Sequence, residues 1–177
     1  VIIISHIAFF LFISFFNGRI FLKLSYKNNL DLNIYETVFF GLIITGFFAQ
    51  ILNFFLPLND KIIYFNLLII SFYIFTNYKN FNIHLTVKDI FIFIFLIFFV
   101  FILIYGSSFS DDLNHYHNGY ITNTDNFNYI FGLNFLHHHY GYSSIWLILH
   151  SYFNFDNNIL QDIHILNGII LISVLGT

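Results

Sequence analysis

The sequence is poor in charged residues. Only 8% of its 177 residues are charged, whereas 58% are hydrophobic; soluble domains carry about 25% charged residues. Six basic and nine acidic side chains are too few to cover the apolar surface of a soluble fold. Because the hydrophobic residues form unbroken runs, we predict an all-α integral membrane protein.

Other residue types are also scarce or missing. The absence of cysteine excludes disulfides and thiolate chemistry. The net charge of −3 argues against a nucleic-acid partner, which needs clustered lysine and arginine. Pro57 is the single proline, and no Gly/Ser or Pro linker divides the chain. We therefore predict one polytopic membrane domain over residues 1–177 and expect it to be a truncated part of a longer protein.

Five apolar runs are predicted to be transmembrane helices. They cover residues 1–16, 35–57, 61–77, 90–106 and 163–177. Asn17-Gly18 is predicted to end the first helix and Pro57 the second. Four polar residues within or next to these runs are expected to face other helices rather than lipid: Gln50, Asn53, Asn66 and His164.

Basic residues give the expected orientation of these helices. Arg19, Lys23 and Lys27 follow the first run, and Lys79 and Lys88 follow the third. The excess of positive charge in cytoplasmic loops places both connectors in the cytoplasm. The fourth run then leaves on the other side, so the polar stretch after it is predicted to be extracytoplasmic.

That polar stretch, residues 107–142, is the longest in the chain and holds three of the nine acids and five of the nine histidines. The apolar residues 143–155 after it fall below the ~17 needed to cross a bilayer, and they include Trp146, a residue typical of the membrane interface. We predict an interfacial or re-entrant helix there. A span beginning at Leu133 instead would bury His137–His139 in lipid at high cost.

Asp111 and Asp112 are the strongest candidates for chemistry. Adjacent carboxylates can bind a divalent cation such as Mg²⁺ or Mn²⁺ through oxygen, or accept a proton from an attacking hydroxyl. If the segment is helical, His115 and Tyr116 lie one turn from the two acids and can orient them. The alternative is that both aspartates are ordinary solvated loop charges.

The histidines of the polar stretch are weaker candidates for a metal site. His115 and His117 would share one face of an extended segment and could ligate a metal from it. His137–His139 are consecutive, which is not a usual ligand spacing. We therefore favour polar contacts at the membrane interface, with one histidine touching an anionic head group or phosphate.

Four sequence motifs carry a resemblance to known proteins. They are F-F-L-P-L-N at residues 54–59, S-D-D-L-N-H-Y-H at residues 110–117, F-G-L-N-F-L-H-H-H-Y-G-Y-S-S-I-W-L-I-L-H-S-Y-F at residues 131–153 and H-I-L-N-G-I-I-L at residues 164–171. Their order resembles an uncharacterised family of bacterial multi-spanning membrane proteins. The layout of that family is similar to the GT-C glycosyltransferases, which place an acidic pair in an extracytoplasmic loop after a span, followed by interface helices.

The resemblance implies a glycosyltransferase in the bacterial inner membrane. It implies a polyprenyl-phosphate sugar as donor and a glycan, lipid or protein outside the membrane as acceptor. Asp112 would be the catalytic base, supported by Asp111, because Asn114 stands where a second acid is expected. The substrate-binding positions would be His115, Tyr116, His117, His137 and Trp146.

Two other functions are open at this stage. The chain could belong to a membrane protein of polysaccharide export, polymerisation or transport that performs no glycosyl transfer. That function predicts polar residues aligned inside the spans rather than gathered in the loop. A purely structural membrane anchor is the third alternative.

Overall fold

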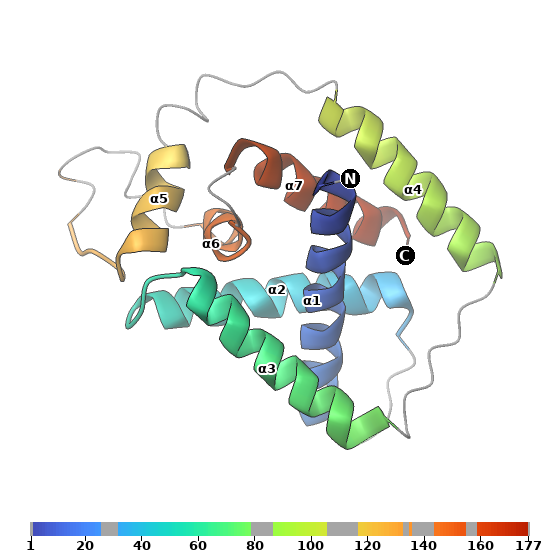
Figure 1. Ribbon diagram of the computed structural model, residues 1–177, viewed down its shortest axis with the longest axis horizontal. Helices are drawn as coiled ribbons and strands as arrows, with labels where there is room; N and C mark the ends of the chain where they lie inside the picture. Colours follow the sequence, from blue (N-terminus) through green and yellow to red (C-terminus); the bar gives the residue numbers. More distant parts are fainter. Residues whose placement is uncertain are drawn as a thin grey trace.

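The computed structural model describes residues 2–25, 32–78, 87–105, 117–132, 135, 144–154 and 159–176. In this part of the chain all regular structure is helical, as predicted. Figure 1 shows the seven α-helices, which are α1 (Ile2–Ser25), α2 (Ile34–Asn53), α3 (Asp60–Asn77), α4 (Val87–Tyr105), α5 (Asn118–Asn126), α6 (Ile145–Tyr152) and α7 (Ile159–Leu175).

Two of these helices, α1 and α2, are long and apolar enough to cross a membrane, judged by length and composition alone. The other three runs expected to span coincide with α3, α4 and α7, which are 18, 19 and 17 residues long. Shorter apolar segments are found within α4 and α7. The eight-residue α6 confirms the short helix expected within residues 143–155.

The prediction that α1 ends at Asn17-Gly18 is wrong, because the helix continues to Ser25. Both residues serve the contact with α2 instead. A Cβ atom on Gly18 would lie 2.2 Å from the backbone oxygen of Thr37, and Asn17 Nδ2 donates to Thr45 Oγ1 at 2.8 Å. Glycine inside a helix costs ~1 kcal/mol relative to alanine, and the close approach of the two helices offsets that cost.

Local capping fixes the ends of α2. Asn33 Oδ1 accepts the backbone N–H of Glu36 at 2.7 Å, and Glu36 Oε2 accepts that of Asn33 at 2.8 Å, which completes a capping box. The helix ends at Asn53, four residues before the proline expected to end it. Asn59 then caps α3 by accepting a backbone N–H of its first turn. The turn between α2 and α3 therefore covers residues 54–59.

The backbones of α1 and α2 touch where these helices cross (Figure 1). A Cβ atom on Gly41 would lie only 1.7 Å from the backbone oxygen of Ser14. Further along α2, a Cβ atom on Gly46 would meet the side chains of Ile145 and Leu149 on α6. Small residues on α2 thus allow close packing on both neighbours, which makes α2 the central helix.

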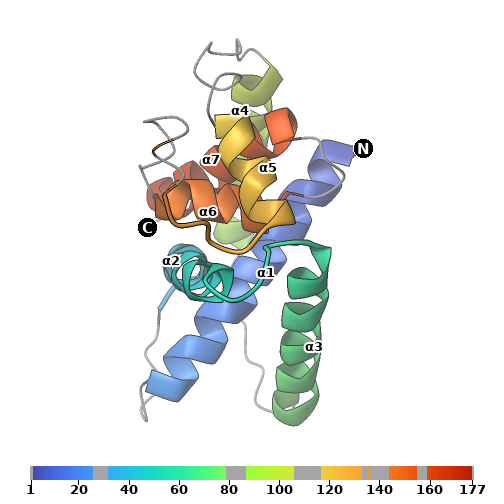
Figure 2. The same ribbon diagram turned by 90° about the vertical axis from the view of Figure 1, so that its left-hand side faces the viewer.

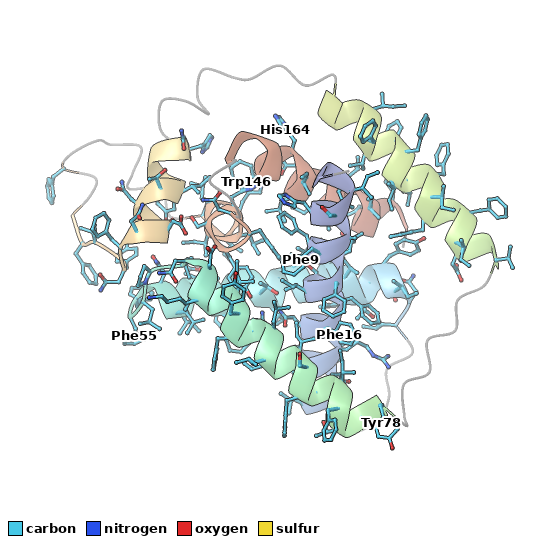
Figure 3. The ribbon with its side chains drawn as sticks, viewed as in Figure 1. Phe9, Phe16, Phe55, Tyr78, Trp146 and His164 are labelled. Atoms are coloured by element: carbon cyan, nitrogen blue, oxygen red, sulfur yellow. The ribbon has the colours of Figure 1, made fainter. Side chains whose placement is uncertain are left out.

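The core joins α1, α2, α3, α6 and α7, while α3 and α4 each keep an apolar face exposed. Its most buried side chains are Ile7, Phe10, Ile13, Leu42, Ile63, Ile148, Phe153, Ile165 and Leu166. Large side chains stay exposed on the outer faces of α3 and α4 (Figure 3), among them Phe65, Leu68, Phe72, Phe75, Phe91, Phe95 and Phe98. Figure 2 shows α3 beside the lower part of α1, below α5, α6 and α7.

Helix termini form two groups on the side of the molecule away from α5, a side called here the Lys23 end (Figure 1). The Lys23 side chain donates to Asn77 Oδ1, which joins the last turns of α1 and α3. The Tyr35 hydroxyl, in the first turn of α2, donates to the Asp89 backbone oxygen in the first turn of α4 at 3.2 Å. A Cβ atom on Gly176, just after α7, would meet the Tyr35 ring. The ends of α1 and α3 form the first group, and the termini of α2, α4 and α7 form the second, called the Tyr35 group, which lies apart from the first in Figure 1.

The opposite end of α2 lies against α5 and is called the α5 end. The backbone N–H of Leu58 donates to the Thr124 backbone oxygen at 2.9 Å, so the turn 54–59 is bonded to α5. The 20 residues of α2 correspond to a rise of ~30 Å. This length separates the Tyr35 group from the α5 end.

Candidate functional site

The described residues contain part of the site expected from the sequence. His117 and Trp146 belong to that part. The other expected site residues lie outside the described residues; they are Asp111, Asp112, His115, Tyr116 and His137.

His117 and Trp146 lie in direct contact. Their ring centroids are 5.3 Å apart and the rings meet edge to face at 74°, a favourable aromatic geometry. His117 immediately precedes α5, and Trp146 lies in the first turn of α6, where Ser144 Oγ accepts its backbone N–H at 3.2 Å. Ser144 thus forms the N-cap. The contact joins the last residue of the motif at 110–117 to the tryptophan of the motif at 131–153.

Trp146 also contacts α7 and the next turn of its own helix. Its Nε1 donates to Asn167 Oδ1 on α7 at 2.7 Å. Its ring lies 4.1 Å from that of His150, at 80°. Figure 3 shows Trp146 and His164 on the same side of the molecule, next to α7. We call His117, Trp146, His150, His164 and Asn167 the Trp146 cluster.

His150 is the most unusual member of the Trp146 cluster. It is only 2% exposed, and neither of its ring nitrogens has a hydrogen-bond partner among the described residues. Burial, together with the nearby His117 and His164, lowers its pKa to about 3, so the ring is neutral at pH 7. Buried polar groups are nearly always hydrogen-bonded in proteins. A polar ligand reaching His150 would therefore gain hydrogen bonds that the protein itself leaves unmade.

The sequence analysis did not single out His150, although one signal was present. The residue lies four positions after Trp146 in an otherwise apolar helix, I-W-L-I-L-H-S-Y. Residues four apart share one face of a helix, so a histidine at this spacing is placed beside the tryptophan.

Polar side chains also join α5 to α6. Thr124 Oγ1 and Ser151 Oγ form a buried hydrogen bond, and Asn154 Nδ2, just after α6, donates to Asp125 Oδ2 at 3.4 Å. Burial and the nearby carboxylate of Asp60 raise the pKa of Asp125 to about 6, against a lowering effect of the Asn154 hydrogen bond. The polar region thus extends from the Trp146 cluster along α5 to the turn 54–59.

Two of the polar residues expected to face other elements do so. Asn53 Nδ2 donates to the backbone oxygens of Thr124 and Phe127 at 3.3 and 3.4 Å, and Asn66 Nδ2 donates to the Tyr152 hydroxyl. Both amides connect the α2–α3 region to α5 or α6. Their donor groups serve packing, which is the role expected from the sequence.

The chain matches the model of one protein family over nearly its whole length. The match covers residues 1–176, and the family is described as Domain of unknown function (DUF8201). This chain belongs to the DUF8201 family. Neither a curated protein nor a solved structure matches the chain.

The DUF8201 chain offers neutral groups for recognition in the Trp146 cluster. Lys88 is the last basic residue in the sequence, so residues 89–177 bring no lysine or arginine to a ligand. Among the described residues, no group of three or more histidine, cysteine, aspartate or glutamate side chains is placed to hold a metal ion. An indole, an amide and a neutral imidazole are suited to hydroxyl-rich or aromatic ligands rather than to simple anions.

Proposed function

We propose that this DUF8201 chain is a multi-spanning membrane protein with its α5 end outside the cytoplasm. Large exposed side chains on α3 and α4 would be unfavourable in water but suit lipid. Both basic connectors follow helices that terminate at the Lys23 end, and five of the six basic residues lie in or next to these connectors. The positive-inside rule then places the Lys23 end in the cytoplasm.

The length of α2 supports the same arrangement. Its ~30 Å rise equals the thickness of a typical hydrocarbon core. The turn 54–59 and α5 lie together at its far end, since Leu58 is bonded to Thr124. The turn and residues 107–142 are thus assigned to one side, the extracytoplasmic face of a bacterial inner membrane.

For activity, we propose a GT-C-like glycosyltransferase that uses a polyprenyl-phosphate sugar. The contact between His117 and Trp146 carries this proposal, because it joins the Asp-containing motif to the tryptophan motif. Asp112 precedes His117 by five residues, a chain length of at most ~18 Å. The chain length alone therefore allows the proposed catalytic acid to act on a sugar held at the Trp146 cluster.

In the proposed reaction, Asp112 and the Trp146 cluster have different roles. Asp112 accepts the proton of the acceptor hydroxyl while that oxygen attacks the anomeric carbon. The bond from this carbon to the phosphate oxygen breaks, and the polyprenyl phosphate leaves with the bonding electron pair. The Trp146 cluster holds the sugar through the indole ring and neutral hydrogen bonds. A divalent cation at Asp111 and Asp112 would supply positive charge to the leaving phosphate.

The test compares cells that carry the full-length protein or its Asp112→Asn variant at equal expression. We expect extracytoplasmic glycosylation to fall by roughly 10²-fold or more, because the amide cannot act as a base. Asp89→Asn, the same change at the Lys23 end, is the matched control and should keep wild-type profiles of lipid-linked sugars. Unchanged profiles in Asp112→Asn would reject the glycosyltransferase and favour polysaccharide export or transport.

A further inference from the structure

Acidic residues from two helices gather at the α5 end. Asp60 is the first residue of α3, and Asp125 lies on α5 next to Thr124. The bond between Leu58 and the Thr124 backbone oxygen, 2.9 Å long, holds the start of α3 beside α5. The Asp60 carboxylate raises the electrostatic cost of ionising Asp125, and within the described residues neither acid forms an ion pair. The fold thus brings two acidic side chains together at this end.

Buried amide oxygens adjoin the same carboxylates. Asn154 is 4% exposed, and while its Nδ2 donates to Asp125, its Oδ1 has no hydrogen-bond partner in the described part of the chain. Asn53 is 1% exposed, and its Oδ1 likewise has no partner there. The Asn53 amide nitrogen reaches the backbone oxygens of Thr124 and Phe127, on either side of Asp125. Around Asp125, the described residues therefore offer more hydrogen-bond acceptor oxygens than donor groups.

We propose that Asp60, Asp125 and Asn154 form a binding site for Ca²⁺. Ca²⁺ takes six to eight oxygen ligands from carboxylates, amides and backbone carbonyls in flexible geometry, whereas Mg²⁺ requires near-ideal octahedral geometry and retains water. Rotation of the Asn154 carboxamide would turn Oδ1 toward the carboxylates. The amide oxygen and the carboxylate oxygens would repel one another unless a cation lay between them. Two carboxylates, an amide and water are the donor set of a weak site, with a Kd of roughly 10⁻⁴–10⁻³ M.

Bound Ca²⁺ would hold three segments together. Asp60 belongs to α3 directly after the turn 54–59, Asp125 belongs to α5, and Asn154 follows α6. The N-terminal end of α5 adjoins His117, which contacts Trp146. The cation would therefore stabilise the packing on which the Trp146 cluster depends, without itself touching a ligand in that cluster. This site stands independently of the proposed glycosyl transfer.

The test measures thermal unfolding of the purified full-length protein in detergent. Wild-type protein in 10 mM CaCl2 should have a Tm roughly 3–10 °C above that in EDTA at matched ionic strength. Asp60→Asn and Asp125→Asn should each lose most of this rise. Asn154→Asp, which adds a ligand charge, should unfold earlier in EDTA and show a larger rise with Ca²⁺. Calorimetric titration should detect one bound Ca²⁺ fewer in Asp125→Asn than in the wild type.

Two controls separate this site from others. Asp89→Asn should keep the full Ca²⁺-dependent rise, since this acid lies at the Lys23 end. Asp112→Asn should also keep this rise. The test of the Ca²⁺ site therefore does not depend on whether Asp112 is catalytic. A wild-type Tm that does not respond to Ca²⁺, or a full response in Asp125→Asn, would overturn the proposal. An equal rise with Mg²⁺ would overturn the assignment to Ca²⁺.

Discussion

The crossing of α1 and α2 and the contact of α5 with α6 hold helices together in different ways. At the crossing, Gly41 lets two backbones touch, and Thr45 Oγ1 both accepts from Asn17 and donates to the Gly41 backbone oxygen at 2.6 Å. At the α5–α6 contact the partners are side chains, and His150 remains buried with both nitrogens unpaired. At the crossing Asn17 and Thr45 satisfy each other, and the one unpaired group among the described residues is the small hydroxyl of Ser14. At the α5–α6 contact the unpaired group is a whole imidazole.

This difference indicates where function is located. An unpaired buried polar group costs ~1–3 kcal/mol, and such costs persist in folded proteins mainly at functional sites. The α1–α2 crossing contains no titratable side chain among the groups that make it, so it serves stability. The α5–α6 region retains groups that a ligand or cation would satisfy.

Adding a side chain at the crossing should have the largest effect on stability. In Gly41→Ala the new Cβ would lie 1.7 Å from the Ser14 backbone oxygen, and neither backbone can move without separating the helices. We expect a loss of about 3 kcal/mol or more in the free energy of unfolding, measured by thermal or chemical unfolding in detergent.

Gly46→Ala is the matched control for this substitution, in the same helix. Its Cβ would meet the side chains of Ile145 and Leu149, which can adjust, so the loss should be clearly smaller. If Gly46→Ala destabilises the protein as much as Gly41→Ala, backbone contact is not what distinguishes the crossing.

The second prediction concerns pH and the α5–α6 region. The pKa of His150 is about 3 in the folded protein, below the 6.5 of a free histidine. The unfolded chain therefore binds a proton below pH 6.5 that the folded chain does not, and stability falls as pH decreases toward 3. Between pH 7 and pH 5 this amounts to about 2 kcal/mol.

The measurement compares wild type with His150→Gln at pH 7 and pH 5. Because glutamine does not titrate, the variant should lose about 2 kcal/mol less than the wild type over this interval. Equal losses in the two proteins would show that His150 is not held neutral by its surroundings.

The sequence predicted the helices made of apolar runs better than the helices that depend on tertiary contacts. The runs that became α2, α3, α4 and α6 were located from hydrophobicity. The end of α1 was placed too early, because Asn17 and Gly18 break isolated helices and only the crossing with α2 explains their position. Local preference was overridden there by packing.

Helix α5 and the candidate site show the same limit. The α5 sequence, N-G-Y-I-T-N-T-D-N, is rich in residues of low helix propensity, and its bonds to Leu58 and Ser151 come from distant parts of the chain. His117 and Trp146 were each named from motifs, but no spacing rule predicts their contact. His150 lies within the motif at 131–153 but was not named as a site residue, because a single histidine in an apolar helix shows no catalytic or metal-ligand spacing.

A third prediction compares polar pairs from the two regions by double-mutant cycles. Asn17→Ala and Thr45→Val remove the bond at the crossing, and Thr124→Val and Ser151→Ala remove the one between α5 and α6. We expect a coupling energy of about 1 kcal/mol for each buried pair, from unfolding of the single and double variants. A coupling near zero at Asn17–Thr45 would mean that the glycine contacts alone hold the crossing.

The smallest effect on stability is expected at Trp146. Trp146→Phe keeps an aromatic ring beside His117 and His150 but removes the hydrogen bond to Asn167, which is exposed to solvent and contributes ~0.5 kcal/mol. The Tm should therefore change by no more than ~2 °C, whereas sugar transfer should fall if the indole N–H and ring hold the donor. Asn167→Ala, which removes the same bond and leaves the indole, separates these roles. Loss of transfer in Trp146→Phe alone assigns the effect to the ring, and loss in both variants assigns it to the orientation that Asn167 imposes on the indole.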